Sequence, residues 1–375
     1  MSFFGLDWCY KKPKPHVPHV PTVTVTGEEE VVVVKPEKFK VSEDITFPNT
    51  RLICSPWFLK GGLCLKPDLE HYEDRYFYDV IDYIGKHDVG NSARVMIFQN
   101  EGHFHNENTL VLPHPKVNGK YDLHTINPAW ERQVIDRIEY MVERRIAVRL
   151  LLNDGHAIRQ WHSHWLNGDN NHGWNERPTY LDKYGWSHWV HLADPDYGNE
   201  DERARYEATR DYLFFMYDWV FSKVKDYHPY IIIDNNEVES YAYWHKAMGK
   251  ICNSHGLSRD YMISSLMALD YWKKPYISEY WTPEIHGIQS VAKYEAEKHW
   301  LEDGVSWIPS ADGGGEAWID MGADEAVRIL ETSLDDGNLG FGGNSEGQWD
   351  DMNPEIYNIG MKMTDRFKDW LDDNA

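Results

Sequence analysis

The feature that most constrains the fold of this chain is an alternation, repeated from Arg51 onward, of short apolar segments and longer amphipathic ones. A short unbroken apolar run is typical of a strand buried on both faces of a parallel sheet. Eight expected strands with helices between them predict an α/β protein with a (β/α)8 TIM barrel. The expected strands are Leu52–Cys54, Arg94–Phe98, Ala147–Leu152, Tyr230–Ile233, Tyr261–Leu266, Tyr276–Ile277, Val305–Ile308 and Leu339–Phe341.

The amphipathic segments predict the helices that connect these strands. Pro128–Arg145 has the clearest start signal, because Asn127 is a capping residue and Pro128 suits the first helical position. The other expected helices are Tyr72–Ile84, Arg203–Lys225, Tyr241–Ser254, Gln289–Glu302, Ala323–Leu334 and Pro354–Leu371.

The first 50 residues differ in composition from the rest. Lys11–Pro21 is rich in Pro, His and Lys, which favours an extended segment, and Thr22–Val34 holds β-branched runs. We therefore expect an N-terminal extension or arm over residues 1–50 and the barrel over residues 51–375. The arm is either a short hairpin laid on the barrel or an attachment segment.

Charge and cysteine content exclude several classes of partner. The formal net charge of −23 argues against nucleic acid, since phosphate binding needs clustered Lys and Arg. No apolar run is long enough to span a membrane, and no secretory signal is visible, so we expect a cytoplasmic or particle-associated protein. The four Cys lack metal-site spacing; Cys54 and Cys64 either pair or are free buried thiols. The sequence predicts no oligomeric state.

A long aromatic-rich loop is expected after the third strand. It runs from Asn153 to about Glu202 and belongs to a chain with 17 Trp and 23 Tyr, residues that suit sugar rings but also fill cores. Loops of this length are usually functional or disordered, and the aromatic density argues against disorder. The loop either walls a cleft or forms a packed lid. Its tryptophans are Trp161, Trp165, Trp174, Trp186 and Trp189.

Three glutamates follow strand candidates. Asn235, Asn236 and Glu237 come directly after Tyr230–Ile233, and α/β barrels carry their chemistry at the carboxyl ends of strands. Glu279 and Glu316 occupy comparable places after later strands. Two facing carboxyl groups are what cleavage of a glycosidic bond needs. The alternatives are a helix cap at the Asn pair and solvated or salt-bridged carboxylates.

Several of these motifs resemble clan A retaining glycoside hydrolases, especially family five with its cellulases and mannanases. The resemblance covers about residues 51–320 and rests on short motifs: Asn236-Glu237, Ile277-Ser-Glu-Tyr-Trp281, Gly304-Val-Ser-Trp307 and Leu152-Asn-Asp-Gly-His156. It implies that Glu237, at the end of the fourth strand, is the acid/base and that Glu279 is the nucleophile, a residue that closes the seventh strand in that clan.

The resemblance also implies the surroundings of the two acids. Asn236 would bind the sugar 2-hydroxyl, Asn153 and His156 would line the sugar site, and Tyr271 or Tyr280 would steady the nucleophile. Trp281 and Trp307 would either floor the site or belong to the barrel core. The implied substrate is a β-linked oligo- or polysaccharide, with no cofactor and no metal.

One spacing departs from the family pattern. Only about 42 residues separate Glu237 from Glu279, so plain counting places Glu279 at strand six and Asp312 or Glu316 after strand seven. Either a short strand lies near Leu269–Trp272, or the nucleophile is Glu316. The local context favours Glu279, which leaves Glu316 as a substrate-binding residue.

Two other functions are consistent with the sequence. His103 and His105 follow the second strand and His156 follows the third, an arrangement that suits metal ligands in a metal-dependent TIM-barrel hydrolase. A non-catalytic carbohydrate-binding barrel would use the same aromatic residues without turnover.

Overall fold

The computed structural model describes most of the chain from Leu52 onward. The described residues are 52–59, 63–64, 72–97, 110–153, 165–179, 200–235, 249–257, 261–266, 281–298, 307–311, 315–343 and 354–374. The predicted arm over residues 1–50 lies outside this set, and the division into arm and barrel stays a prediction.

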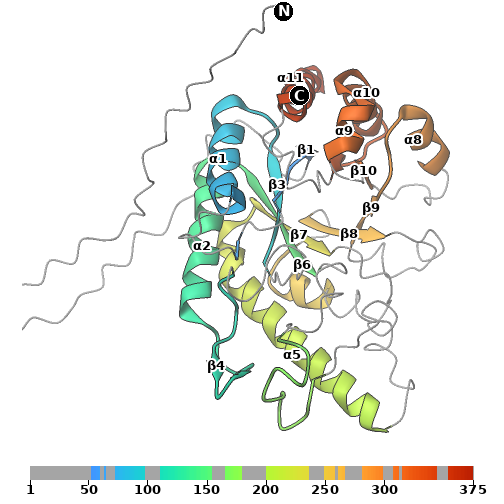
Figure 1. Cartoon of the computed structure of the whole chain (residues 1–375). Helices are drawn as coiled ribbons and strands as arrows, with labels where there is room; N and C mark the ends of the chain where they lie inside the picture. Colours follow the sequence, from blue (N-terminus) through green and yellow to red (C-terminus); the bar gives the residue numbers. More distant parts are fainter. Residues whose placement is uncertain are drawn as a thin grey trace, which may run out of the picture. The chain divides into compact units, whose positions relative to one another are not determined.

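The strands form one closed parallel barrel (Figure 1). Their order around the sheet is β1-β11-β10-β9-β8-β7-β6-β3-β2. Only Pro56 and Trp57 separate β1 from β2, so this single length of chain pairs with β11 on one side and with β3 on the other, which closes the sheet. The predicted (β/α)8 TIM barrel is confirmed. The strand bounds are β1 Ile53–Ser55, β2 Phe58–Leu59, β3 Ser92–Met96, β6 Ala147–Asn153, β7 Ile231–Asn235, β8 Met262–Leu266, β9 Thr282–Ile285, β10 Ile308–Ala311 and β11 Gly340–Gly343.

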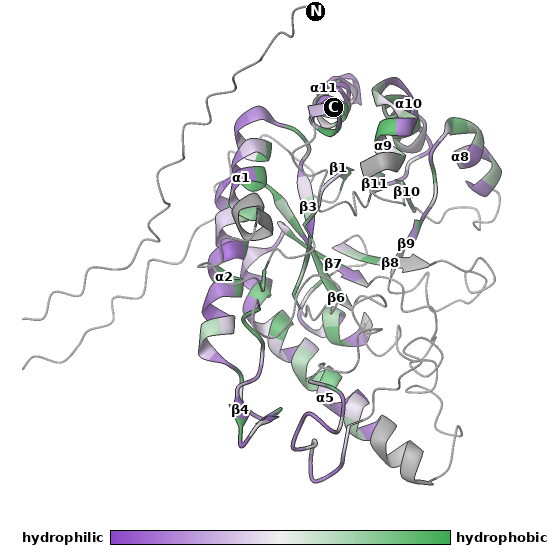
Figure 2. Ribbon diagram, in the orientation of Figure 1, coloured by the Kyte–Doolittle hydropathy of each residue, from purple (hydrophilic) through white to green (hydrophobic). Residues whose placement is uncertain are grey.

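Helices follow the strands and surround the barrel (Figure 1). The Asn127 side chain accepts a hydrogen bond from the Ala129 backbone N–H, with Pro128 at the first helical position, as predicted. In Figure 2, α2 and α11 carry long hydrophilic stretches, whereas β6 is largely hydrophobic. The helix bounds are α1 Tyr72–His87, α2 Pro128–Glu143, α5 Glu200–Val224 with the 3-10 turn η2 Lys225–Tyr227, α8 Val291–Glu297, α9 Gly315–Met321, α10 Ala323–Asp335 and α11 Pro354–Asn374.

The sixth and seventh strands differ from the predicted ones. β9 begins at Thr282, after the predicted Tyr276–Ile277, which lies outside the described residues. β10 begins at Ile308, the last residue of the predicted Val305–Ile308. The signal for β9 is weak because its sequence is Thr-Pro-Glu-Ile, in which a proline and an acid interrupt the apolar pattern.

The lumen of the barrel is largely apolar at the amino ends of the strands. Most of the side chains that face inward at the amino ends of the strands are aliphatic, fully buried and part of one hydrophobic cluster that continues into the packing of α8, α10 and α11. Ser92 of β3 and Thr282 of β9 are buried polar exceptions. Alternate residues of a strand share a face, so the inward positions one step toward the carboxyl ends form a second layer. The apolar set is Ile53, Ala147, Ile232, Ile263 and Ile308.

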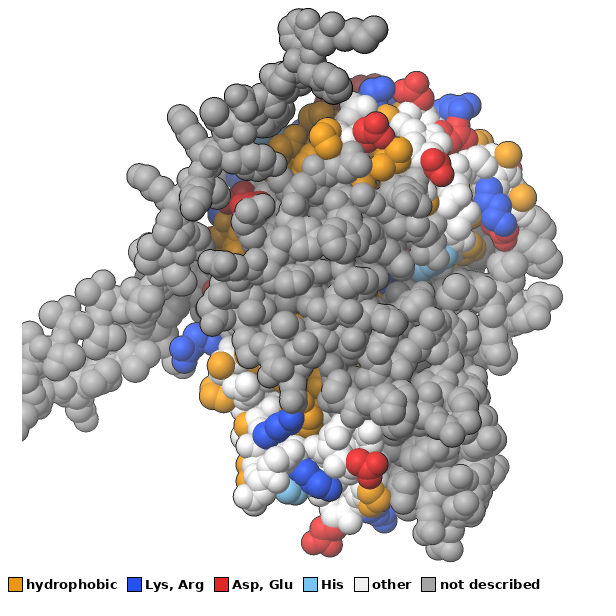
Figure 3. All heavy atoms as spheres, viewed as in Figure 1, with side chains coloured by type: hydrophobic (Ala, Val, Ile, Leu, Met, Phe, Trp, Pro, Cys, Tyr) orange, Lys and Arg blue, Asp and Glu red, His pale blue; other side chains and the backbone are white. Residues whose placement is uncertain are grey.

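The described surface is mixed in charge. On the face seen in Figure 3, Asp/Glu and Lys/Arg side chains are interspersed over the C-terminal helices. Lys362 pairs with Asp324, and Lys298 lies 3.3 Å from Asp336, both across neighbouring helices. Such exposed pairs contribute little to the free energy of unfolding.

Two further expectations concern membranes and thiols. Within the described part of the chain, no helix combines the length and the apolar character that crossing a bilayer requires. Cys54 and Cys64 are buried thiols that form no disulfide, which confirms one of the two alternatives. Burial raises the pKa of the Cys54 thiol to about 12.

Closure of the barrel predicts a sharp difference between two glycines. Gly340 starts β11 with φ +113, and a Cβ there would overlap the Ile53 carbonyl oxygen, whereas Gly337 has φ +80 and open space around it. Gly337→Ala should cost about 1–2 kcal/mol from backbone strain alone. Gly340→Ala adds a backbone clash and should cost at least about 3 kcal/mol more. Urea unfolding of both variants measures the difference, and equal costs would contradict the closure at this position.

Candidate active site

The carboxyl ends of the third and fourth strands carry the first predicted site residues. Asn153 ends β6 and is the register partner of Asn235, which ends β7. Asn236 and Glu237 continue the chain directly from that end. β7 is the fourth strand of the barrel, as predicted, so this motif leaves from the face where (β/α)8 barrels hold their chemistry. The side chain of Asn153, and the whole of Asn236, Glu237 and His156, lie outside the described part of the structure.

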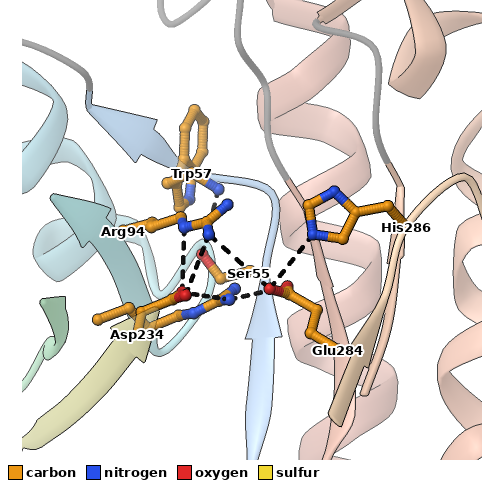
Figure 4. A network of polar contacts seen from close by, with 7 residues as sticks. Ser55, Trp57, Arg94, Asp234, Glu284 and His286 are labelled. Atoms are coloured by element: carbon orange, nitrogen blue, oxygen red, sulfur yellow. Dashed lines mark hydrogen bonds and ion pairs between the residues drawn. The ribbon is translucent and has the colours of Figure 1, made fainter. Parts of the chain in front are cut away.

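A group of buried charged side chains lies inside the lumen, between the apolar layer and the carboxyl ends of the strands (Figure 4). Asp234 of β7 is held by two arginines. Arg94 of β3 places its Nε 3.0 Å from Oδ2 and donates from Nη2 to Oδ1 at 3.0 Å. Arg149 of β6 donates from Nη2 to Oδ2 at 2.8 Å. The side chains are 0–1 % exposed, so these contacts form without competition from water.

Glu284 of β9 joins the same group from the opposite side of the lumen. Its Oε1 accepts from Arg149 Nη2 at 2.8 Å, its Oε2 lies 3.9 Å from Arg94 Nη2, and His286 Nε2 is 3.6 Å from Oε2 (Figure 4). Burial is the largest effect on the pKa of Glu284 and raises it. Arg149, Arg94 and His286 together outweigh burial and hold that pKa well below its ordinary value. Glu284 is therefore a permanently ionised carboxylate near neutral pH.

The charges in this group compensate one another, because two arginines face two carboxylates. Burying an isolated charge costs far more than a pair gains, so two guanidinium groups inside a barrel require two carboxylates. We call Arg94, Arg149, Asp234 and Glu284 the lumen quartet. Sequence reasoning missed this quartet, although Arg94 and Arg149 each interrupt an apolar run at an inward-facing position. An arginine inside a strand that is otherwise apolar was the available signal.

The two predicted platform tryptophans have the positions of core residues, one of the alternatives left open by the sequence. Trp281 and Trp307 precede β9 and β10, at the amino ends of those strands, and are 0 % and 3 % exposed. Trp307 stacks on Tyr294 of α8 with ring centroids 5.0 Å apart. This end of the barrel is opposite to the face from which Glu237 leaves.

The strand order bears on the second acid. Glu279 and Tyr271 lie outside the described residues, and in the sequence Glu279 precedes β9, the sixth strand. Glu316 belongs to the first turn of α9, just after β10, the seventh strand, although its side chain is not described. By chain order, Asp312 and Glu316 therefore follow the carboxyl end of strand seven.

Part of the aromatic-rich loop packs on the segment that follows strand two. The hairpin of β4 Lys116–Val117 and β5 Lys120–Tyr121 meets residues 165–179 through a bridge between Tyr121 and Asn171. The Asn171 side chain donates from its amide nitrogen to the Trp165 carbonyl at 2.6 Å and accepts from the Gly173 N–H at 2.7 Å. In the chain, the two segments come after strands two and three of the barrel.

The two described tryptophans of the loop fill this subdomain instead of lining a cleft. Trp165 is 2 % exposed and Trp174 is 8 % exposed. Trp174 stacks on His124, with centroids 4.3 Å apart and an interplanar angle of 11°, and contacts Phe215 of α5. Of the two alternatives for the loop, these two residues therefore fit the packed lid. Trp161, Trp186 and Trp189 lie outside the described residues.

The predicted metal ligands are not covered by the structure. Among the residues it describes, no three His, Cys, Asp or Glu side chains form a group that would hold a metal ion. His103, His105 and His156 fall in segments that are not described. The metal-dependent alternative therefore stays open on structural grounds.

Glu284 predicts an acid-sensitive stability. Its folded-state pKa is lowered, so its ionised form stabilises the fold above the unfolded pKa of about 4.3, and this contribution is lost as the pH falls through the folded-state pKa. At pH 7, Glu284→Gln should lower the free energy of unfolding by about 3 kcal/mol, because it leaves buried guanidinium charge uncompensated. The difference in free energy of unfolding between Glu284→Gln and the parent protein should become smaller below about pH 4.

Urea unfolding over a pH series measures this difference. Asp324→Asn is the control, because this exposed acid pairs only with Lys362 among the contacts described and should shift stability by less than about 0.5 kcal/mol. A stability difference between Glu284→Gln and the parent that does not change with pH would show that the pKa of Glu284 is the same in the folded and the unfolded protein, which would contradict its lowering in the fold.

Comparisons with known proteins agree with this architecture. No protein-family model matches the chain, and no curated protein matches its sequence. A glycoside hydrolase family 5 mannosidase from Rhizomucor miehei is similar in structure, with TM-scores of 0.57 and 0.54 in two structures. It is 8 % and 10 % identical, over 86 % and 85 % of this chain and 94 % of that chain.

A tri-modular family 5 endo-beta-1,4-glucanase from Bacillus licheniformis is also similar, with a TM-score of 0.50 and 12 % identity. The match covers 84 % of this chain and 59 % of that longer one. At such identities the likeness concerns the fold. The chain has the (β/α)8 barrel fold that these family 5 glycoside hydrolases also have.

Proposed function

We propose that this protein is a retaining glycoside hydrolase that acts on a β-linked glycan at the carboxyl end of its barrel. The observation that carries the proposal is the position of Asn235 at the end of the fourth strand, from which Asn236-Glu237 continues. This is the place that the clan A motif requires for its acid/base. The fold shared with family 5 enzymes supports the same conclusion.

In the proposed reaction, Glu237 starts protonated and gives its proton to the glycosidic oxygen as the bond to the anomeric carbon breaks. A second, ionised carboxylate attacks that carbon and forms a glycosyl ester. Glu237, now a base, takes a proton from water, whose oxygen attacks the anomeric carbon and releases the second carboxylate. The two carboxyl groups of a retaining site lie about 5–5.5 Å apart.

Two glutamates compete for the role of nucleophile. The Ser-Glu-Tyr-Trp context favours Glu279, whereas the strand order favours Glu316, which follows β10. We keep Glu279 as the proposed nucleophile on its motif alone, because its place in the chain before β9 is on the amino side of strand six. Glu316 either contacts the substrate or replaces Glu279 in this role, as its place after strand seven favours.

The surrounding polar residues have proposed binding roles. Asn236 would hold the sugar 2-hydroxyl, and Asn153 and His156 would line the site from the end of strand three. Tyr271 or Tyr280 would steady the nucleophile. The buried positions of Trp281 and Trp307 favour a core role for these two residues.

The substrate is proposed at the level of class only. The similar structures are those of a mannosidase and an endo-beta-1,4-glucanase, both of which act on sugars. A β-linked oligo- or polysaccharide fits the acidic surface of this chain better than a polyanion does.

The metal content of the purified protein distinguishes the retaining mechanism from the metal-dependent alternative. A metal-dependent hydrolase that uses His103, His105 and His156 would contain a stoichiometric transition metal in the purified protein. The retaining mechanism needs none.

We predict that Glu237→Gln lowers kcat by about 10³-fold, because it removes the acid that protonates the leaving oxygen. Glu279→Gln should be equally inactive. Release of reducing ends from β-glucan, mannan and xylan, and the anomeric configuration of the first product by NMR, measure the outcome.

Glu143→Gln, an exposed position at the end of α2, is the matched control and should keep the parent rate. An active Glu279→Gln beside an inactive Glu316→Gln moves the nucleophile to Glu316. Near-normal rates for Glu237→Gln on every substrate that the parent cleaves would refute the proposal.

A further inference from the structure

The lumen quartet connects distant strands to the end of strand four. Asp234 has both carboxylate oxygens occupied, by Arg94 from strand two and Arg149 from strand three. The same Nη2 of Arg149 also donates to Glu284 on strand six. The position of the Asp234 side chain on strand four therefore depends on strands two, three and six.

Strand eight, β11, makes room for the Arg149 guanidinium group because its residue 342 is a glycine. A Cβ on Gly342 of β11 would lie 2.8 Å from Arg149 Nη1. The guanidinium group thus extends across the lumen as far as the backbone of β11, and only glycine leaves it this room. Gly342 does not adopt a positive φ, so steric space is what an alanine would change there.

Asp234 immediately precedes the polar end of its strand. Asn235 is the last residue of β7, and Glu237 follows two residues later. A side chain at Asp234 that is bound on both oxygens fixes the backbone from which these residues depart. Buried ion pairs are often no more stabilising than apolar packing, which favours a role in geometry over one in stability.

We propose that Asp234 is a positioning residue, clamped by Arg94 and Arg149, that holds the end of strand four in the geometry that the acid/base requires. Gly342 is part of the same device, because it admits the Arg149 guanidinium group. The inference rests on the proposed function, since it assigns Asp234 a role toward Glu237. It adds residues that contact no sugar but determine the rate at which sugar is cleaved.

The test uses two variants that disturb the clamp in different ways. Asp234→Asn removes the charge that the two arginines bind, while Gly342→Ala changes no charge and displaces Arg149 from across the barrel. Gly360→Ala is the control: it also introduces a close contact, 2.6 Å from Val89 Cγ1, but in α11 outside the barrel. Kinetics are measured on the full chain, at a temperature where thermal scans show all variants folded.

Both clamp variants should lower kcat by about 10–100-fold with KM within about threefold, because sub-ångström misplacement of a catalytic group acts on the transition state. Gly360→Ala should keep the parent kcat. If Gly342→Ala and Asp234→Asn are folded and keep the kcat of Gly360→Ala, the positioning role is wrong, and the quartet serves stability alone.

A second readout separates this inference from the proposed function. Crystal structures of the parent and of Gly342→Ala compare the backbone of residues 235–237, which needs no activity. A shift of these residues together with Arg149 supports the clamp even if the parent cleaves no glycan. An unmoved strand end beside a displaced Arg149 overturns it.

Discussion

The burial of two arginines inside a β-barrel is the constraint on which the rest of the structure depends. Arg94 and Arg149 are fully buried, and a guanidinium group cannot release its proton to escape that environment. The fold must therefore bring Asp234 and Glu284 to them from strands four and six. The aliphatic layer at the amino ends of the strands closes the lumen below, so the charged layer lies toward the carboxyl ends.

This division of the lumen is consistent with the proposed site at the carboxyl ends of the strands. The amino-terminal half is packed with Ile53, Ile232, Ile263 and Ile308, which carry no groups for acid–base chemistry. The carboxyl-terminal half presents fixed charges and, one residue beyond Asp234, the polar end of strand four. Preorganised charges of this kind, held out of contact with water, exert stronger electrostatic effects than the same charges in water.

The sequence predicted the parts of this arrangement that local patterns encode. Apolar runs identified the strands that include Ile53, Val148 and Ile232, and the Asn127-Pro128 signal identified a helix start. It could not predict β9, because Glu284 looks exposed until Arg149, 135 positions away, is known to bind it. Nor could it separate the two ends of a strand when its boundaries were uncertain by a few residues, which is why Trp281 and Trp307 were candidates for the site.

The central claim is that a sugar binds over the carboxyl ends of the strands with Glu237 beside the bond that breaks. The most direct measurement is a crystal structure of Glu237→Gln with a β-linked oligosaccharide soaked into it. We predict a glycosidic oxygen within hydrogen-bonding distance of the side-chain amide introduced at position 237 and a second carboxylate on the opposite side of the anomeric carbon. A sugar bound elsewhere, or residue 237 turned into bulk solvent with no acid nearby, would contradict the account.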